Sequence, residues 1–166
     1  SQYENVSSVK VSGFEGEVSY QYKDDLRVLV NCSYQDARDM NRYKDDGKPS
    51  ITYNNKLPNR PWLFSNVEAD YIFRDVLKNG DKLKLSYHYQ YVHWFYLTWE
   101  AYGSLDGKSK IPTQHQHNAV VSYSWKNERY NVSFGCNNLF DKELYDNFML
   151  QKPGRSFFAK FRIFIN

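Results

Sequence analysis

The sequence has few of the features that mark the common classes of protein. Its 166 residues include 2 cysteines and 2 methionines, and no apolar run approaches the roughly 18 to 20 residues that a membrane-spanning helix requires. A helical membrane protein is therefore excluded. Cys32 and Cys136 lie far apart, without Cys/His metal spacing, so neither a zinc site nor a disulfide framework is implied. We predict two unpaired thiols.

A strong excess of one charge is also missing. The chain has 22 basic and 19 acidic residues and a net charge of +3. No cluster of Lys and Arg resembles the basic stripe that binds a nucleic-acid phosphate backbone. We therefore expect no nucleic-acid partner. No histidine stands near a serine or cysteine with a nucleophile signature, so no enzyme is predicted. His115 and His117 lack a third ligand, and we predict no metal site and no cofactor.

Aromatic residues are abundant instead, at 18% of the chain with 15 tyrosines, although the mean hydropathy is −0.77. This composition excludes intrinsic disorder. Apolar and polar residues alternate with period two, which is typical of strands with two different faces. The alternation recurs in the segments 14–22, 26–35, 63–74, 82–91, 118–125, 130–137 and 157–165. The sequence predicts an all-β, antiparallel up-and-down meander of about seven strands.

The apolar flank of these segments carries no charged residue, whereas the polar flank does. The charges on the polar flank are Glu15, Glu17, Arg27, Glu68, Asp70, Arg74, Lys82 and Lys84. The first segment is irregular, because Val9 and Val11 share the parity of Glu15. This slip predicts a β-bulge near Gly13.

The connections alternate between short and long. The short ones are 23–25, 76–81 and 126–129, with Asn79-Gly80 as a hairpin turn pair, and the long ones are roughly 37–61, 100–115 and 140–155. In a meander, all short turns then share one end of the sheet. This pattern indicates the wall of a transmembrane β-barrel, with the apolar flank toward lipid, a polar lumen and long external loops.

Two alternatives remain open from the residues. The first is a soluble β-barrel or β-sandwich that binds a sugar or lipid and has the aromatic flank as its core. The second is a complete eight-stranded outer-membrane protein with residues 2–9 as an extra strand. Detergent dependence separates the soluble module from the membrane proteins, and the full reading frame separates a fragment from a whole protein.

The last third of the chain carries a run of motifs. They are Asn138, Leu139, Phe140 and Asp141, then Pro153, Gly154 and Arg155, and finally the aromatic strand that includes Phe164. This run resembles the C-terminal end of the TonB-dependent outer-membrane receptors. The resemblance implies a plugged barrel of the 22-stranded class, of which residues 1–166 are the C-terminal section. Neither the plug nor the TonB-binding motif has a match, and the chain ends on Asn166 rather than on the family's usual aromatic.

The resemblance also implies a role and partners. It points to energised uptake of a scarce ligand, such as a siderophore-bound iron, haem or cobalamin, across the bacterial outer membrane. The expected partners are outer-membrane lipid, the remaining strands and plug, the TonB complex through other parts of the receptor, and a small-molecule ligand at the external loops. The polar-flank charges would hold the plug by ion pairs. The aromatic and histidine residues expected to meet the ligand are Trp62, Tyr102, His115, His117, Tyr145 and Phe148.

Overall fold

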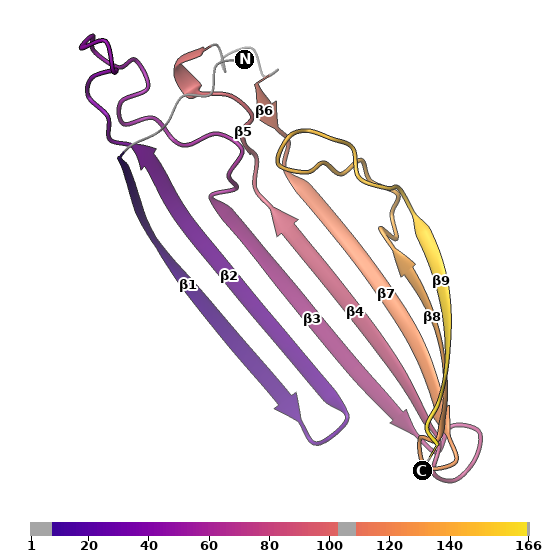
Figure 1. The fold of residues 1–166 in the computed structure, drawn as a ribbon. Coiled ribbons are helices and arrows are strands. Elements are labelled where there is room, and N and C mark those ends of the chain that lie inside the picture. Colours follow the sequence, from indigo (N-terminus) through magenta and orange to yellow (C-terminus); the bar gives the residue numbers. More distant parts are fainter. Residues whose placement is uncertain (1–7, 103–108, 166) are drawn as a thin grey trace.

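The computed structural model describes residues 8–102 and 109–165, and most of them belong to one antiparallel sheet (Figure 1). Its strands, in spatial order, are β1 (Val9–Tyr22), β2 (Leu26–Asp39), β3 (Leu63–Arg74), β4 (Lys82–Val92), β7 (Gln114–Trp125), β8 (Tyr130–Asn137) and β9 (Ser156–Ile163). Every neighbouring pair is antiparallel. The predicted all-β meander of seven strands is confirmed.

The chain segment that connects β4 to β7 forms a second, small sheet. It pairs β5 (Phe95–Tyr96) with β6 (Lys110–Ile111), and a short 3-10 helix, η1 (Glu100–Tyr102), follows β5 in the chain. In the part of the chain that the structure describes, no helix is long and apolar enough to cross a membrane.

The turns and loops lie at opposite ends of the large sheet, as predicted (Figure 1). The turns 23–25, 75–81 and 126–129 lie at one end, and the connections 40–62 and 138–155, with residues 93–102 and 109–113, lie at the other. The strand β1 therefore begins at the loop end, and β9 finishes at the turn end. One end of the sheet is compact, and the other carries nearly all of the irregular chain.

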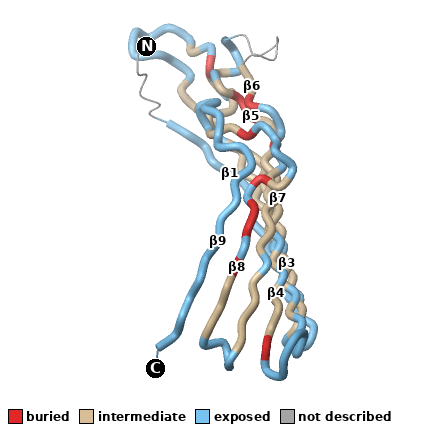
Figure 2. The backbone as a smooth tube through the Cα atoms, turned by 90° about the vertical axis from the view of Figure 1, so that its right-hand side faces the viewer, coloured by how far each residue is buried: buried red, intermediate tan, exposed pale blue. Residues whose placement is uncertain are grey.

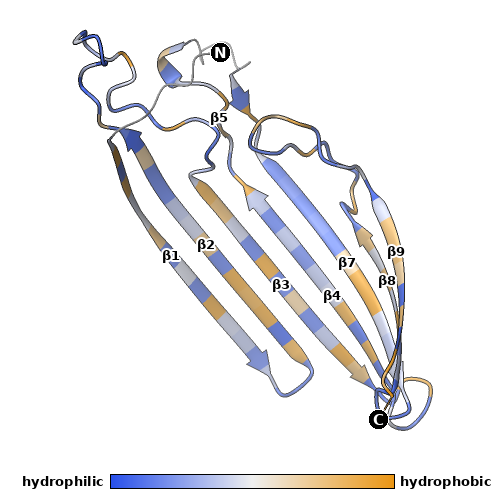
Figure 3. Ribbon diagram, viewed as in Figure 1, coloured by the Kyte–Doolittle hydropathy of each residue, from blue (hydrophilic) through white to orange (hydrophobic). Residues whose placement is uncertain are grey.

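Cross-strand pairing divides the sheet into an apolar face and a polar face. One row on the apolar face consists of Tyr22, Leu26, Tyr71, Leu85, Val121, Phe134 and Ala159. A row on the polar face consists of Glu17, Asn31, Asn66, Gln90 and Gln116. Figure 3 shows this alternation as bands of opposite hydropathy along the strands.

No second layer covers the apolar face over the described residues. Val18 is 70% exposed and Phe134 is 61% exposed, and Leu85, Tyr87 and Val121 are also exposed. Figure 2 shows that the edge strands β1 and β9 are exposed along their lengths. In a soluble sandwich these side chains would form the core, so the soluble alternative does not fit. The exposure matches a face that lipid covers.

The β-bulge predicted near Gly13 is wrong. Pairing between β1 and β2 continues without interruption from Val9↔Asp39 to Tyr22↔Leu26. A Cβ on Gly13 would lie 2.1 Å from the Tyr34 carbonyl oxygen, so glycine allows the two backbones to approach closely here. The sequence pattern slips because the two faces reverse their polarity on the N-terminal side of Gly13. The apolar residues Val9 and Val11 lie on the same side of the sheet as the polar face.

The complete eight-stranded alternative also lacks support. It needs an additional strand from residues 2–9, but Val9 already belongs to β1, and residues 1–7 lie outside the described part. The strands β1 and β9 stand at opposite edges of the sheet order. The described sheet is an open section of wall.

Candidate functional site

The external loops contain most of the buried apolar side chains in the described chain. Phe95 (1% exposed), Ile111 (0%), Leu144 (3%) and Tyr96 are buried there, and Phe95 pairs with Ile111, whereas the large sheet contributes only Ala37 and Cys136 to the buried apolar set. Burial and a hydrogen bond with Glu100 raise the pKa of the Tyr96 phenol. The loops thus have buried apolar side chains of their own, and we call Phe95, Tyr96, Ile111 and Leu144 the loop core.

Asn59 joins all three external loops. Its backbone N–H donates to the Tyr96 carbonyl at 2.7 Å. In the amide orientation that satisfies both groups, its side-chain nitrogen donates to the carbonyls of Leu97 and Asn147 at 2.9 Å each. Its φ of 57° lies in the left-handed region that Asn tolerates better than most residues. One side chain thus connects loop 40–62 with the other two loops.

The motif residues Asn138 and Asp141 organise the last external loop. Asn138 is 2% exposed, and its amide exchanges two hydrogen bonds with the backbone of Lys142, at 2.8 and 2.9 Å. Asp141 Oδ1 accepts the N–H of Arg155 at 2.7 Å and would lie 2.9 Å from a Cβ on Gly154. Asp141 therefore holds together the two ends of the loop 138–155, beside a glycine that leaves room for its carboxylate.

Four of the proposed ligand-contact residues lie in the external connections. Tyr102 is 50% exposed at the end of η1, and Phe148 is 67% exposed. The Tyr145 phenol donates to Glu143 at 3.0 Å, and this contact raises its pKa. Trp62 lines a small cavity of about 10 Å³ beside Gln35 and Tyr96, which holds about one water molecule.

His115 and His117 lie in β7 and not in the expected loop. Their side chains share the apolar face with the tyrosines of β4, and each ring nitrogen Nδ1 meets a phenol. Tyr87 Oη lies 2.6 Å from His117 Nδ1, and Tyr89 Oη lies 2.8 Å from His115 Nδ1. The strand β7 pairs with β4 from Gln114 onward, so it starts four residues earlier than the hydropathy pattern indicates. The phenols give the two imidazoles polar partners on the apolar face.

These histidines belong to a continuous chain of ring contacts that crosses the sheet near its loop end. Successive ring centroids lie between 4.5 and 6.1 Å apart. The chain, which we call the external belt, runs through Phe14, Tyr34, Trp62, His93, Tyr91, His115, Tyr89, His117 and Phe140. Aromatic rings concentrate at the boundaries of the hydrocarbon layer, so the external belt marks the outer boundary.

A second group of rings lies near the turns. Tyr123 stacks on Trp125 at 5.6 Å, and Trp125 stacks on Tyr130 at 5.5 Å. Tyr71 and Phe73 are 4.6 Å apart on β3. The apolar face therefore has aromatic side chains at both ends and mainly Val, Leu, Ala and Cys between them.

The predicted polar-flank charges all lie on the polar face, but they have different partners. Lys84 pairs with Asp70 at 3.1 Å, and Asp70 also accepts the Ser86 hydroxyl at 2.6 Å. Glu15, Glu17, Glu68 and Arg27 have no ion-pair partner within 4 Å in the described chain. These four side chains remain available to a partner on the polar face.

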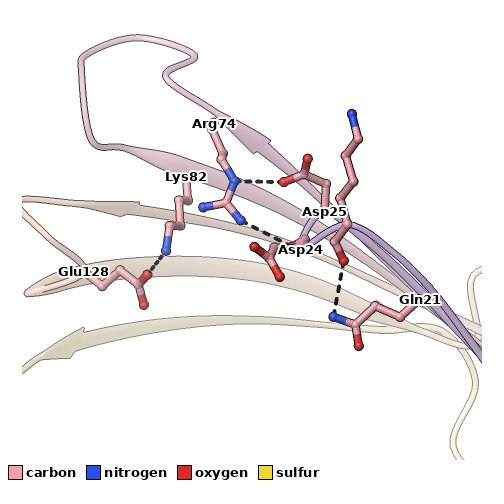
Figure 4. Close-up of polar contacts among 7 residues, drawn as sticks. Gln21, Asp24, Asp25, Arg74, Lys82 and Glu128 are labelled. Carbon is pink, nitrogen blue, oxygen red and sulfur yellow. Dashed lines mark hydrogen bonds and ion pairs between the residues drawn. The ribbon is translucent and has the colours of Figure 1, made fainter.

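Arg74 and Lys82 make contacts near the turns (Figure 4). Arg74 donates from Nε to Asp25 at 2.8 Å, and Lys82 pairs with Glu128. These contacts connect the ends of β3 and β4 to the adjacent turns. They form a charged rim rather than part of the central polar face.

The turn 75–81 is built around Asp81 and not around Asn79-Gly80 alone. The Asp81 carboxylate accepts the backbone N–H groups of residues 76, 77 and 78 and the Tyr123 hydroxyl, at 2.6 to 2.9 Å. Burial opposes the charged form, yet these hydrogen bonds together lower the pKa of Asp81. No hydropathy period and no turn dipeptide in the sequence predicts this role.

This arrangement of belts, two-faced strands, short turns and external loops defines a section of outer-membrane β-barrel. Residues 1–139 match the family model described as TonB dependent receptor-like, beta-barrel, and the chain belongs to that family. The bacterial outer membrane is therefore its location, and the family consists of receptors rather than enzymes. The family model therefore covers the chain up to the start of the C-terminal motifs, which begin at Asn138.

A solved structure gives an independent comparison. The chain is similar to BauA, the ferric preacinetobactin receptor from Acinetobacter baumannii, with a TM-score of 0.70 and 17% sequence identity. The similarity covers 91% of this chain but 21% of that receptor, so this chain spans about a fifth of the solved receptor's length. No curated protein matches the chain.

Proposed function

We propose that residues 1–166 form the C-terminal section of a 22-stranded TonB-dependent transporter that takes up a scarce small molecule. The single observation that carries this proposal is the open, two-faced sheet, whose unpaired edges β1 and β9 require further strands. The remaining strands and the plug would come from other parts of the same receptor. Engagement of the TonB complex would also occur through those parts.

The ligand in this proposal is an iron-bearing siderophore or a comparable small molecule, and it contacts the exposed loop surface. The similarity to a siderophore receptor supports this class. The cavity beside Trp62 is too small for such a ligand, and the exposed Tyr102 and Phe148 supply open aromatic surface. Binding would therefore require loops from the rest of the barrel.

Uptake by cells that produce the intact receptor tests this role. We expect Tyr102→Ala and Phe148→Ala each to raise the half-saturating concentration of an iron–siderophore about tenfold, since aromatic side chains that a ligand covers contribute strongly to binding. Leu77→Ala is the matched control, because Leu77 is 73% exposed in a turn at the opposite end. Unchanged uptake in both loop variants, at equal receptor abundance, would contradict the assignment.

We further propose that the unpaired charges of the polar face contact the plug. Glu17 on β1 and Glu68 on β3 lie on the polar face without ion-pair partners in the described chain, whereas Asp70 already pairs with Lys84. Glu68→Lys should therefore release the plug to added protease more readily than Asp70→Asn. Equal protection and equal transport in the two variants would count against the contact.

A further inference from the structure

The outward faces of β1 and β2 become basic beyond the external belt. Lys10 and Arg38 are cross-strand partners, and Arg38 in turn bridges to Lys56. Paired residues share a face of the sheet, and this register continues the apolar face of Phe14 and Tyr34. Two cross-strand pairs beyond the aromatic pair Phe14 and Tyr34 on the same side of the sheet, the outward face therefore carries three cationic side chains.

Trp62 connects the basic cluster directly to the belt. Lys56 Nζ lies 3.9 Å from the centroid of the Trp62 ring, and Trp62 contacts Tyr34 and His93 within the belt. Because the belt marks the edge of the hydrocarbon, these cations lie at the height of the lipid headgroups. Hydrocarbon lies immediately below them on the same face.

The acidic groups nearby do not neutralise the cluster. Asp36 lies between the cations, 2.7 Å from Arg38 and 3.7 Å from Lys56. Glu100, in the adjacent loop, attracts the Arg38 guanidinium electrostatically. The side chain of Arg38 remains 35% exposed despite these contacts. Lys10 is exposed and its side chain has no partner in the described chain, so it can bind an added anion without losing an internal contact.

We propose that Lys10, Arg38 and Lys56 form a docking surface for the phosphate groups of outer-leaflet lipid. A guanidinium can hold a phosphate through two parallel hydrogen bonds, and the two lysines add point charges at its sides. Asp36 and the Trp62 ring position Arg38 and Lys56, while the belt below contacts the acyl chains. The lipid phosphate thereby replaces water on a face that already adjoins the bilayer. This inference requires the outer-membrane location and does not depend on which ligand the receptor transports.

Lipid binding to the intact receptor in a nonionic detergent tests the proposal. The probe is fluorescent bisphosphorylated lipid A, with its dephosphorylated form and inorganic phosphate as separate arms. Each basic side chain near a lipid surface contributes about fivefold to affinity, the equivalent of about 1 kcal/mol. We expect Lys10→Gln to weaken binding about fivefold and Lys10→Gln/Arg38→Gln to weaken it roughly 25-fold, with a loss of affinity at high salt.

The control is Lys44→Gln/Lys48→Gln, which removes the same charge from exposed positions of loop 40–62. It should leave lipid binding unchanged. Lys10→Gln keeps the test independent of folding, since no internal contact is lost. Equal affinity in Lys10→Gln and the unaltered receptor, equal binding of dephosphorylated lipid, an equal loss in the control, or tight binding of inorganic phosphate alone would each overturn the proposal.

Discussion

The large sheet and the loop core use the same apolar residue types in opposite ways. In the sheet, side chains such as Val18 and Phe134 remain exposed, and no protein layer covers them. In the loop core, Phe95, Ile111 and Leu144 are almost fully enclosed by protein. Burial of apolar surface stabilises both regions, but lipid must supply the cover for the sheet, whereas the loops supply their own.

This difference explains how the chain combines a hydrophilic mean composition with membrane insertion. Only every second residue of a strand needs to be apolar, because the other face meets water in the lumen. The loops are then folded as a small water-exposed unit at the end of a wall. Mutations should therefore have different effects in the two regions and on the two faces.

The largest effect should come from a charge on the lipid-facing side of the sheet. Val18 lies on β1 midway between Phe14 of the external belt and Tyr22, so Val18→Arg should destabilise the intact receptor by about 2 to 4 kcal/mol. Ser19→Arg places the same charge on the polar face and should change stability by less than about 1 kcal/mol. Urea titration of the receptor in lipid vesicles measures both, and equal losses would contradict the assignment of the faces.

A smaller effect is expected where the three loops meet. Asn59→Gly keeps the left-handed backbone but removes two amide hydrogen bonds, which should cost about 1 to 3 kcal/mol locally. Protease cleavage within loop 138–155 should accelerate, while resistance of the sheet to urea should remain unchanged. A matched variant, Asn55→Gly, lies in the same loop and should not alter that cleavage rate.

Gly135 offers a test of packing on the polar face. A Cβ at this position would lie 2.2 to 2.9 Å from three ring carbons of Phe158 on the neighbouring strand. Gly135→Ala should therefore cost about 1 kcal/mol as the half-exposed ring is displaced. In a double-mutant cycle with Phe158→Ala, the cost should disappear, and a cost that persists would show that the backbone and not the ring is responsible.

The smallest effect at neutral pH concerns the turn 75–81. Since folding lowers the pKa of Asp81, its contribution to stability is present above the ordinary value of 3.8 and is lost as the pH falls through the lowered value. The protection factors of the Val76, Leu77 and Lys78 amides, which correct the exchange rates for their intrinsic pH dependence, should fall only at acid pH. Asp81→Asn should remove this pH dependence, and wild-type protection factors that stay constant as the pH falls from neutral through the lowered pKa would contradict it.

The sequence predicts the spanning strands well because lipid and lumen impose a strict period of two. The structure has β3 at Leu63–Arg74 and β8 at Tyr130–Asn137, with the bounds that alternation alone indicates. Prediction fails where that constraint ends. On the N-terminal side of Gly13, the outward face meets headgroups and water. The polarity of β1 therefore reverses there, and the sequence pattern resembles the pattern that a bulge produces.

The loop core could not be predicted for a related reason. Phe95 and Ile111 come from two-residue strands and Leu144 from an irregular segment, and all three segments are too short to show a period. Their burial depends on how the loops fold. Asn59 and Asp81 act through single polar side chains, each of which satisfies several backbone groups. The run from Asn138 to Asp141 carries the family resemblance, but only the hydrogen bonds show how these residues close the loop.

Probe accessibility along β4 tests the central assignment of the faces most directly. In the intact receptor with Cys32 and Cys136 replaced by serine, single cysteines at consecutive positions 83 to 88 would carry a nitroxide. We predict that labels at Leu83, Leu85 and Tyr87 relax with oxygen dissolved in lipid, whereas those at Lys84, Ser86 and His88 relax with a water-soluble nickel chelate. Absence of this alternation, or its reversal, would contradict a lipid-facing apolar side.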